Sequence, residues 1–210
     1  MPVNLKIEYP DGQFTALWEI TEDEYSLLQM ASLDKAGLDT FSSLKNPGRR
    51  LEWLAVRALL KHFYPSVPTI DYLKNGKPIL IGHSGKISIS HSGRMVGISV
   101  HPDKAPGIDV EMLHPRIIKI ADRFLAESEK IYVGSVPSVE QLTAIWGAKE
   151  VMFKVYGQDN ISFKNDFEIK PFVLSLKGKL EGLVHRRNDS MIIPMEYMKV
   201  GDFMLVQTAY

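Results

Sequence analysis

A chain of 210 residues can form one large domain or two halves of about 100 residues each, and 45% hydrophobic residues are ample for a core. Twenty-five basic residues balance 25 acidic ones, so no overall charge favours nucleic acid or an anionic membrane as a partner. The absence of cysteine excludes disulfides, zinc–thiolate sites and thiol catalysis, and the lack of a basic, apolar leader or a long apolar run predicts a cytoplasmic protein without a membrane span.

The first half of the sequence predicts a hairpin, helices and short strands, in that order. The hairpin comprises residues 3–9 and 14–20, with a Pro10-Asp11-Gly12 turn. One helix is predicted to open with Thr21-Glu22-Asp23-Glu24, an N-cap with an acidic first turn, and to run to about residue 32; a second is predicted over about residues 49–63. The second helix carries a basic stripe beside an aromatic ring, formed by Arg50, Trp53, Arg57 and Lys61. Strands are predicted at 69–73, 78–81, 86–90 and 95–101.

The stretch from His101 to Pro106 is the predicted boundary between two halves, because prolines and polar residues interrupt the apolar pattern there. The second half predicts a strand at 107–111, a helical region over about 116–132, a long helix from Pro137-Ser138 to Tyr156-Gly157, and three or four strands over 165–210. Sparse matches between the halves indicate an internal repeat, although such matches also arise by chance. The fold class that we expect is α+β, with two similar, pseudo-twofold halves, each a small, mostly antiparallel sheet with packed helices.

The candidate chemistry lies in two short segments of the second half. Glu150 and Lys154 are four residues apart in the predicted long helix, so they share one face. Asp109 and Glu111 alternate with apolar residues along the predicted strand, so both carboxylates point the same way while Ile108 and Val110 turn into the core. Three carboxylates suit a hard divalent cation such as magnesium, and nearby lysines suit a polyphosphate substrate.

Each of these residues also has a purely structural interpretation. A strand of the form Asp-x-Glu is often an ordinary half-exposed strand, and Glu150 with Lys154 could be a surface ion pair worth about 0.3–0.5 kcal/mol. Against this, the long helix is apolar around much of its circumference, so Lys149 and Glu150 lie near a buried surface. Burying a charge there is costly unless the charge is paired or serves a function. We assign Trp53 and Trp146 to the core.

Four motifs together resemble one family. They are NGKP (Asn75 to Pro78), SISHSG (Ser88 to Gly93), GIDVE (Gly107 to Glu111) and WGAKEVMFK (Trp146 to Lys154), in this order. The combination is similar to the 4′-phosphopantetheinyl transferases, in particular the type with both halves in one chain that modifies carrier proteins. The resemblance implies transfer of phosphopantetheine from coenzyme A to a serine of an apo acyl or peptidyl carrier protein, with release of 3′,5′-ADP.

The resemblance also implies roles for individual residues. Asp109, Glu111 and Glu150 would be the Mg²⁺ ligands, and Asp109, Glu150 and Lys154 the catalytic residues. Glu150, or a water that it holds, would take the proton of the serine, and Lys154 would stabilise or protonate the departing phosphate. The coenzyme A contacts would come from Arg50, Arg57, Lys77, His91, Lys149 and Lys154; the basic helix with Arg50 and Arg57 matches the family less closely than the other motifs do.

These roles divide between the halves. Residues 1–104 would contact coenzyme A and the carrier protein, residues 105–210 would hold magnesium and the catalytic residues, and coenzyme A would lie across the cleft between them. A carrier would dock on the N-terminal half or near Arg116 to Phe124, and we expect a monomer that binds neither nucleic acid nor membrane. Two alternatives remain: a magnesium-dependent phosphohydrolase acting on a nucleotide-like pyrophosphate, and an inactive module that binds coenzyme A or a carrier.

Overall fold

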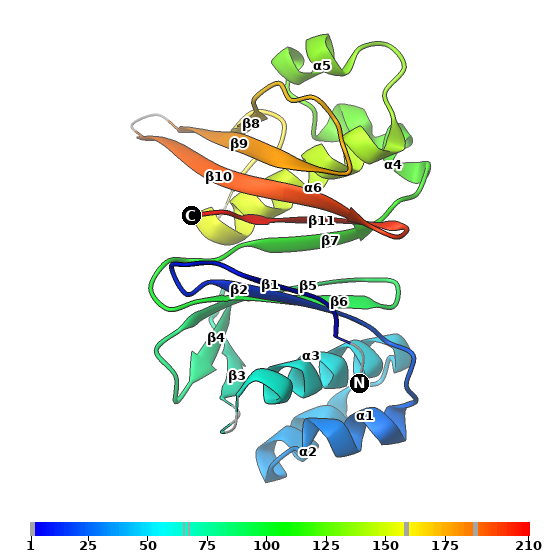
Figure 1. The fold of residues 1–210 in the computed structure, drawn as a ribbon, viewed down its shortest axis with the longest axis vertical. Helices are drawn as coiled ribbons and strands as arrows, with labels where there is room; N and C mark the ends of the chain where they lie inside the picture. Colours follow the sequence, from blue (N-terminus) through cyan, green and yellow to red (C-terminus); the bar gives the residue numbers. More distant parts are fainter. Residues whose placement is uncertain (1–2, 65, 67, 158–159, 187–188) are drawn as a thin grey trace. The chain divides into compact units, whose positions relative to one another are not determined.

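The computed structural model describes residues 3–64, 66, 68–157, 160–186 and 189–210. The chain divides into two compact units, Met1–Lys104 and Ala105–Tyr210, which we call the N-terminal and the C-terminal unit. Each unit combines antiparallel strands with helices (Figure 1), so the predicted α+β class is confirmed. The pseudo-twofold similarity of the halves stays a prediction.

The N-terminal unit is built around a four-stranded antiparallel sheet with the order β1-β2-β6-β5, accompanied by the separate hairpin β3-β4. Its elements are β1 (Val3–Glu8), β2 (Phe14–Glu19), α1 (Glu24–Ala31), α2 (Lys35–Ser43), α3 (Pro47–Phe63), β3 (Thr69–Tyr72), β4 (Pro78–Ile81), β5 (Lys86–Ser92) and β6 (Met95–His101). The sequence predicted all of them except α2, which buries only Phe41 and therefore leaves little apolar pattern.

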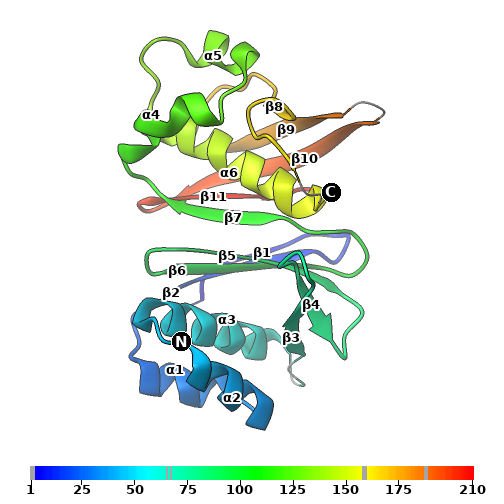
Figure 2. The ribbon, with the colours of Figure 1, turned by 180° about the vertical axis from the view of Figure 1, so that it is seen from behind.

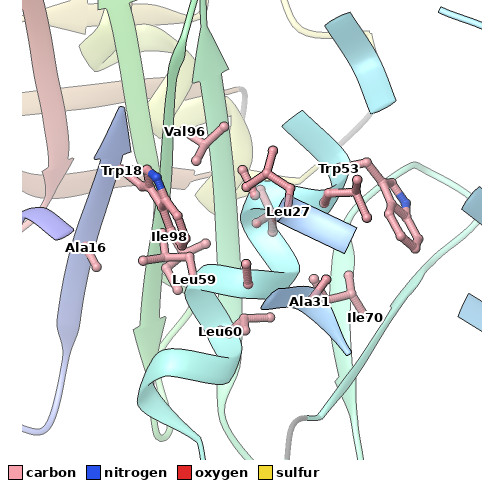
Figure 3. Packing of buried hydrophobic residues seen from close by; sticks show 14 of the residues in the cluster. Ala16, Trp18, Leu27, Ala31, Trp53, Leu59, Leu60, Ile70, Val96 and Ile98 are labelled. Carbon is pink, nitrogen blue, oxygen red and sulfur yellow. The ribbon is translucent and has the colours of Figure 1, made fainter. Parts of the chain in front are cut away.

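Helix α3 begins where the sequence places a start signal. The Asn46 side chain accepts a hydrogen bond from the backbone N–H of Arg49, and Pro47 follows at the first helical position. The inner face of α3 packs Leu59 and Leu60 into a hydrophobic cluster. This cluster also contains Trp18 of β2 and Val96 and Ile98 of β6 (Figure 3). Full burial of one such side chain contributes roughly 1.5–3 kcal/mol, so this cluster fixes α3 and the residues on its other faces.

The C-terminal unit contains a five-stranded antiparallel sheet with the order β7-β11-β10-β9-β8. Its elements are β7 (Ile108–Met112), α4 (Arg116–Ile120), the 3₁₀ turn η1 (Ala121–Arg123), α5 (Glu127–Val133), α6 (Val139–Tyr156), β8 (Phe167–Ile169), β9 (Lys177–Arg186), β10 (Asp189–Val200) and β11 (Phe203–Thr208). The helical region predicted over about 116–132 is divided into three pieces, because Phe124 and Leu125 leave the helical path and enter the core.

Helix α6 packs against the sheet of the C-terminal unit, in contact with β7 and β11 (Figure 2). The Ser138 hydroxyl caps its first turn by accepting from the N–H of Gln141, and Gly157 ends it in the left-handed conformation with φ of 64°. These are the ends that the sequence predicted. Within the described part of the chain, no helix combines the length and the apolar character that crossing a membrane requires.

Candidate active site

Strand β7 and helix α6 approach each other closely because glycines lie at their contact, Gly107 directly before β7 and Gly147 within α6. A Cβ added to Gly147 would lie 2.9 Å from Cγ2 of Val206 and 3.3 Å from Oδ2 of Asp109. A Cβ on Gly107 would lie 2.9 Å from the carbonyl oxygen of Val151. At both glycines, the contact of 2.9 Å leaves no room for a side chain. The glycines of GIDVE and WGAKEVMFK therefore serve the packing that brings the two motifs together.

The orientation of β7 follows its alternating pattern. We predicted that Ile108 and Val110 turn into the core and that Asp109 and Glu111 share the other face, where Glu150 joins them from a helix. Ile108 and Val110 are fully buried, and α6 covers the opposite face of the strand, which carries Asp109. Asp109 is only 4% exposed and Glu111 is half-buried. The candidate carboxylates of β7 thus lie on the strand face that α6 covers.

Lys154 on α6 makes an ion pair with Asp109. Its Nζ donates to Oδ1 of Asp109 at 2.9 Å and to the carbonyl oxygen of Ile108 at 2.7 Å. The lysine side chain is 25% exposed and that of Asp109 is 5% exposed, so the pair lies at the edge of the buried region. One turn earlier on the same helix is Glu150, which is half-buried. The structure therefore brings Asp109, Glu150 and Lys154 to one place.

The environment of Glu150 makes its carboxyl group unusually basic. Burial, together with the negative charges of Asp109 and Glu111, raises its pKa to about 7, although Lys154 acts in the opposite direction. Such repulsion requires the three carboxylates to be close to one another. A carboxyl group with a pKa near 7 can take up or release a proton at neutral pH.

The donor atoms of this group fit a hard cation. Oxygen ligands from carboxylates are those that Mg²⁺ prefers, and a cation would offset the repulsion among Asp109, Glu111 and Glu150. In the described residues, however, no group of three or more His, Asp or Glu side chains is arranged to hold a metal ion, and the ammonium of Lys154 lies on Asp109. The three-ligand magnesium site therefore stays a prediction.

Lys149 points away from this site and into the core of the C-terminal unit. Its Nζ donates to Oε2 of Glu129 at 2.7 Å and to the carbonyl oxygens of Phe124, Phe163 and Phe167 at 2.7–2.9 Å. The side chains of Lys149 and Glu129 are both fully buried. Burial lowers the pKa of Lys149 and raises that of Glu129. This geometry favours a structural role for Lys149 over the predicted contact with a phosphate.

The predicted nucleotide contacts of the N-terminal unit lie partly around one cavity of about 180 Å³. Arg57 and His91 line it together with Gly76 and Pro78 of the NGKP turn. The guanidinium carbon of Arg57 lies 3.2 Å from the centroid of the Trp53 ring, and burial lowers the pKa of Arg57 to about 10, so the side chain stays charged at neutral pH. Arg49 and Glu52 also line the cavity as an ion pair, so Arg57 gives it a net positive charge, and the Trp53 ring forms an aromatic wall.

The other two predicted contacts of this unit differ in setting. Arg50 forms a two-pronged ion pair with Glu24, at 2.6 and 2.7 Å, and donates to the carbonyl oxygens of Phe41 and Leu44, so it joins the three helices α1, α2 and α3. Lys77 is half-buried in the NGKP turn, and burial with the neighbouring Lys86 lowers its pKa. Arg50 therefore has a structural task, whereas Lys77 adds charge close to Pro78.

The sequence reasoning assigned no role to several residues that contact the candidate site. The indole Nε1–H of Trp146 donates to Oε1 of Glu111 at 3.3 Å. Arg49 and Glu52 on α3 both contact the His91 ring. Arg49 and Glu52 are three residues apart at the start of a helix, a spacing that could have indicated a shared face. The four-residue spacing predicted that Trp146 shares a face with Glu150 and Lys154, but it did not identify Glu111 as the partner of the indole.

Comparisons with known proteins agree with the motif resemblance. Residues 105–189 match the model of the 4′-phosphopantetheinyl transferase superfamily, a segment that contains all three carboxylates and Lys154. The chain is 31% identical over 115 residues to the 4′-phosphopantetheinyl transferase AcpT of Escherichia coli O157:H7, an alignment that covers 52% of this chain and 59% of that protein. The same protein of Salmonella typhimurium is 30% identical over 115 residues, covering 52% of this chain and 60% of the relative.

The aligned segment thus spans about three fifths of the length of these curated relatives. The superfamily match falls entirely within the C-terminal unit, where β7 and α6 carry the two motifs. The C-terminal unit is therefore similar to the 4′-phosphopantetheinyl transferase superfamily over residues 105–189.

Proposed function

We propose that this protein transfers the 4′-phosphopantetheine group of coenzyme A to a serine of an apo acyl or peptidyl carrier protein, in a reaction that depends on Mg²⁺. The observation that carries the proposal is the meeting of Asp109, Glu150 and Lys154 between β7 and α6, inside the segment that matches the superfamily. The serine oxygen attacks the phosphorus on the pantetheine side of the pyrophosphate. The bond from that phosphorus to the bridging oxygen breaks, and 3′,5′-ADP leaves with the oxygen.

The protein's own residues position and neutralise the reacting groups. Glu150, or a water that it holds, accepts the serine proton, which suits a carboxyl pKa of about 7. Lys154 supplies a positive charge to the departing ADP phosphate once it turns from Asp109. Asp109, Glu111 and Glu150 would hold Mg²⁺, whose charge would neutralise the two phosphates. No nucleophile of the enzyme is needed, which agrees with a chain that has no cysteine.

The nucleotide would take its remaining contacts from the N-terminal unit. Arg57, His91 and Lys77 belong to or adjoin the cationic cavity, and its volume of about 180 Å³ is below the roughly 300–1,000 Å³ of sites for drug-sized ligands. The cavity therefore fits one phosphate or one ring of coenzyme A rather than the whole molecule. Arg50 and Lys149 are left out of this proposal because both are bound to carboxylates and carbonyl oxygens.

The test is the intact mass of a purified apo acyl carrier protein after incubation with this protein, coenzyme A and Mg²⁺. We expect a gain of one phosphopantetheine group, its loss with EDTA, and its loss with Glu150→Gln. Glu140→Gln is the matched control, because Glu140 lies on the same helix in an exposed pair with Lys199, and it should keep full activity.

Three outcomes would contradict the proposal. Consumption of coenzyme A without modification of several apo carriers would favour the phosphohydrolase alternative. Binding of coenzyme A without any turnover would favour the binding module. Full activity of Glu150→Gln would remove this carboxylate from the reaction.

A further inference from the structure

We infer that Trp146 is a positioning residue for Glu111, acting through its indole N–H. The inference deepens the proposed function and rests on it, because Glu111 is one of the carboxylates assigned to Mg²⁺. The contact joins the two motif elements: Trp146 lies near the middle of α6, Glu111 lies on β7, and Nε1 is 3.3 Å from Oε1. The indole nitrogen can only donate a hydrogen bond, so Oε1 of Glu111 is the acceptor in this contact.

The indole ring is held in place from two sides. The ring of Phe124 meets it edge-on with centroids 5.3 Å apart, and the ring of Phe163 packs against it in a tilted arrangement at 5.4 Å. Aromatic pairs at such separations restrict each other's orientation. With the ring fixed, the direction of the N–H is fixed as well, and Glu111 gains a defined partner on the helix.

The same two phenylalanines are tied to the buried lysine of the motif. Lys149 donates to the carbonyl oxygens of Phe124 and Phe163, at 2.7 and 2.9 Å. Both chain segments that hold the indole are therefore anchored to α6 one turn beyond Trp146. A continuous set of contacts leads from the core through the aromatic rings to the carboxylate, and each step is a hydrogen bond or a ring contact.

Partners that orient a metal ligand contribute to metal affinity, and their removal typically weakens metal binding or activity about 10–100-fold. Trp146→Phe keeps an aromatic ring between Phe124 and Phe163 and removes the N–H. We expect it to weaken Mn²⁺ binding, measured by isothermal titration on the full chain without substrates, by about 10-fold. Trp18→Phe is the matched control, because the Trp18 indole also donates to a glutamate, Glu22, at 3.1 Å in the N-terminal unit; it should leave the Mn²⁺ affinity unchanged.

A double-mutant cycle separates action through Glu111 from a general effect on packing. Glu111→Gln should weaken Mn²⁺ binding, and adding Trp146→Phe to it should cause no further loss. Additive losses would overturn the positioning role, and so would a Trp146→Phe variant that binds Mn²⁺ like the wild type. If Glu111→Gln itself leaves Mn²⁺ binding unchanged, the assignment of Glu111 to the metal is wrong, and the proposed function loses that ligand independently of Trp146.

A second measurement needs no change in the aromatic cluster. In ¹H–¹⁵N spectra of the full chain, Glu111→Gln should shift the indole N–H signal of Trp146 and leave that of Trp18 in place. This outcome remains accessible if Trp146→Phe fails to fold. An unshifted Trp146 signal in the Glu111→Gln variant would show that the two side chains do not interact and would overturn the inference.

Discussion

Replacing Lys149 by methionine tests whether this ammonium stabilises the C-terminal unit or serves a phosphate. The methionine is similar in length and removes the charge and the three N–H donors of Nζ, which are shared among four acceptor oxygens. It leaves the carboxylate of Glu129 fully buried without its counter-ion. Breaking a buried pair from one side costs about 3–5 kcal/mol, a large share of the roughly 5–15 kcal/mol that stabilises a typical domain. We expect a loss of this size in the free energy of unfolding.

The loss should depend on pH in a defined direction. Burial raises the pKa of Glu129 above its unfolded value, while Lys149 works against this shift. Removing the lysine therefore raises the pKa of the folded state further. A carboxyl group whose pKa is higher in the folded state binds its proton more tightly there, so stability falls as the pH rises from the unfolded pKa through the folded one. Lys149→Met should be closer to the wild type at pH 5 than at pH 8.

The assay is urea unfolding, with hydrogen exchange of peptides from α6 reporting on the C-terminal unit alone. Lys199→Met is the matched control: its partner Glu140 also lies on α6, but both side chains are about one third exposed, and such pairs contribute only about 0–1 kcal/mol. Adding Glu129→Gln to Lys149→Met should recover part of the loss. If Lys149→Met keeps wild-type stability and instead binds coenzyme A more weakly, Lys149 contacts the substrate after all.

Three further experiments test other parts of the protein. Carboxyl ¹³C titration should find Glu150 with a pKa of about 7, and added Mg²⁺ should lower it; an unperturbed value would refute the close carboxylates. Gly147→Ala should destabilise the unit by about 1–3 kcal/mol, because its Cβ would lie 2.9 Å from Val206, whereas the same change in an unobstructed helix stabilises by about 1 kcal/mol. Arg57→Ala should raise the KM for coenzyme A while Arg50→Lys lowers only the urea midpoint of the N-terminal unit; equal effects on KM would contradict this division.

The positions of β7 and α6 could be predicted because their signals are local. Ser138 and Gly157 mark the ends of α6 by capping, and the alternation around Asp109 marks the strand. The four-residue spacing of Glu150 and Lys154 follows from the helix period alone. Local rules were therefore enough to predict which elements carry the candidate site. They also predicted that Glu150 and Lys154 share one face of a helix.

The contacts between distant segments could not be predicted in the same way. Lys149 is adjacent to Glu150 in the sequence, but its partner Glu129 is on another helix, and no local pattern links the two. Alternation along β7 predicted which residues share a face, but it did not predict that Asp109 is as buried as its apolar neighbours, which depends on the packing of α6. Tertiary packing decides such cases.

The WGAKEVMFK segment combines two kinds of requirement. Glu150 and Lys154 face Asp109 and carry the proposed chemistry, whereas Gly147 allows the helix to approach the strand and Lys149 anchors it to the core. Trp146 stands between the two groups, since it packs in the aromatic cluster and donates to a carboxylate of the site. Loss of activity on mutating this motif is therefore not by itself evidence of a catalytic role; only variants that keep the unfolding free energy while losing transfer identify the residues that act on the substrate.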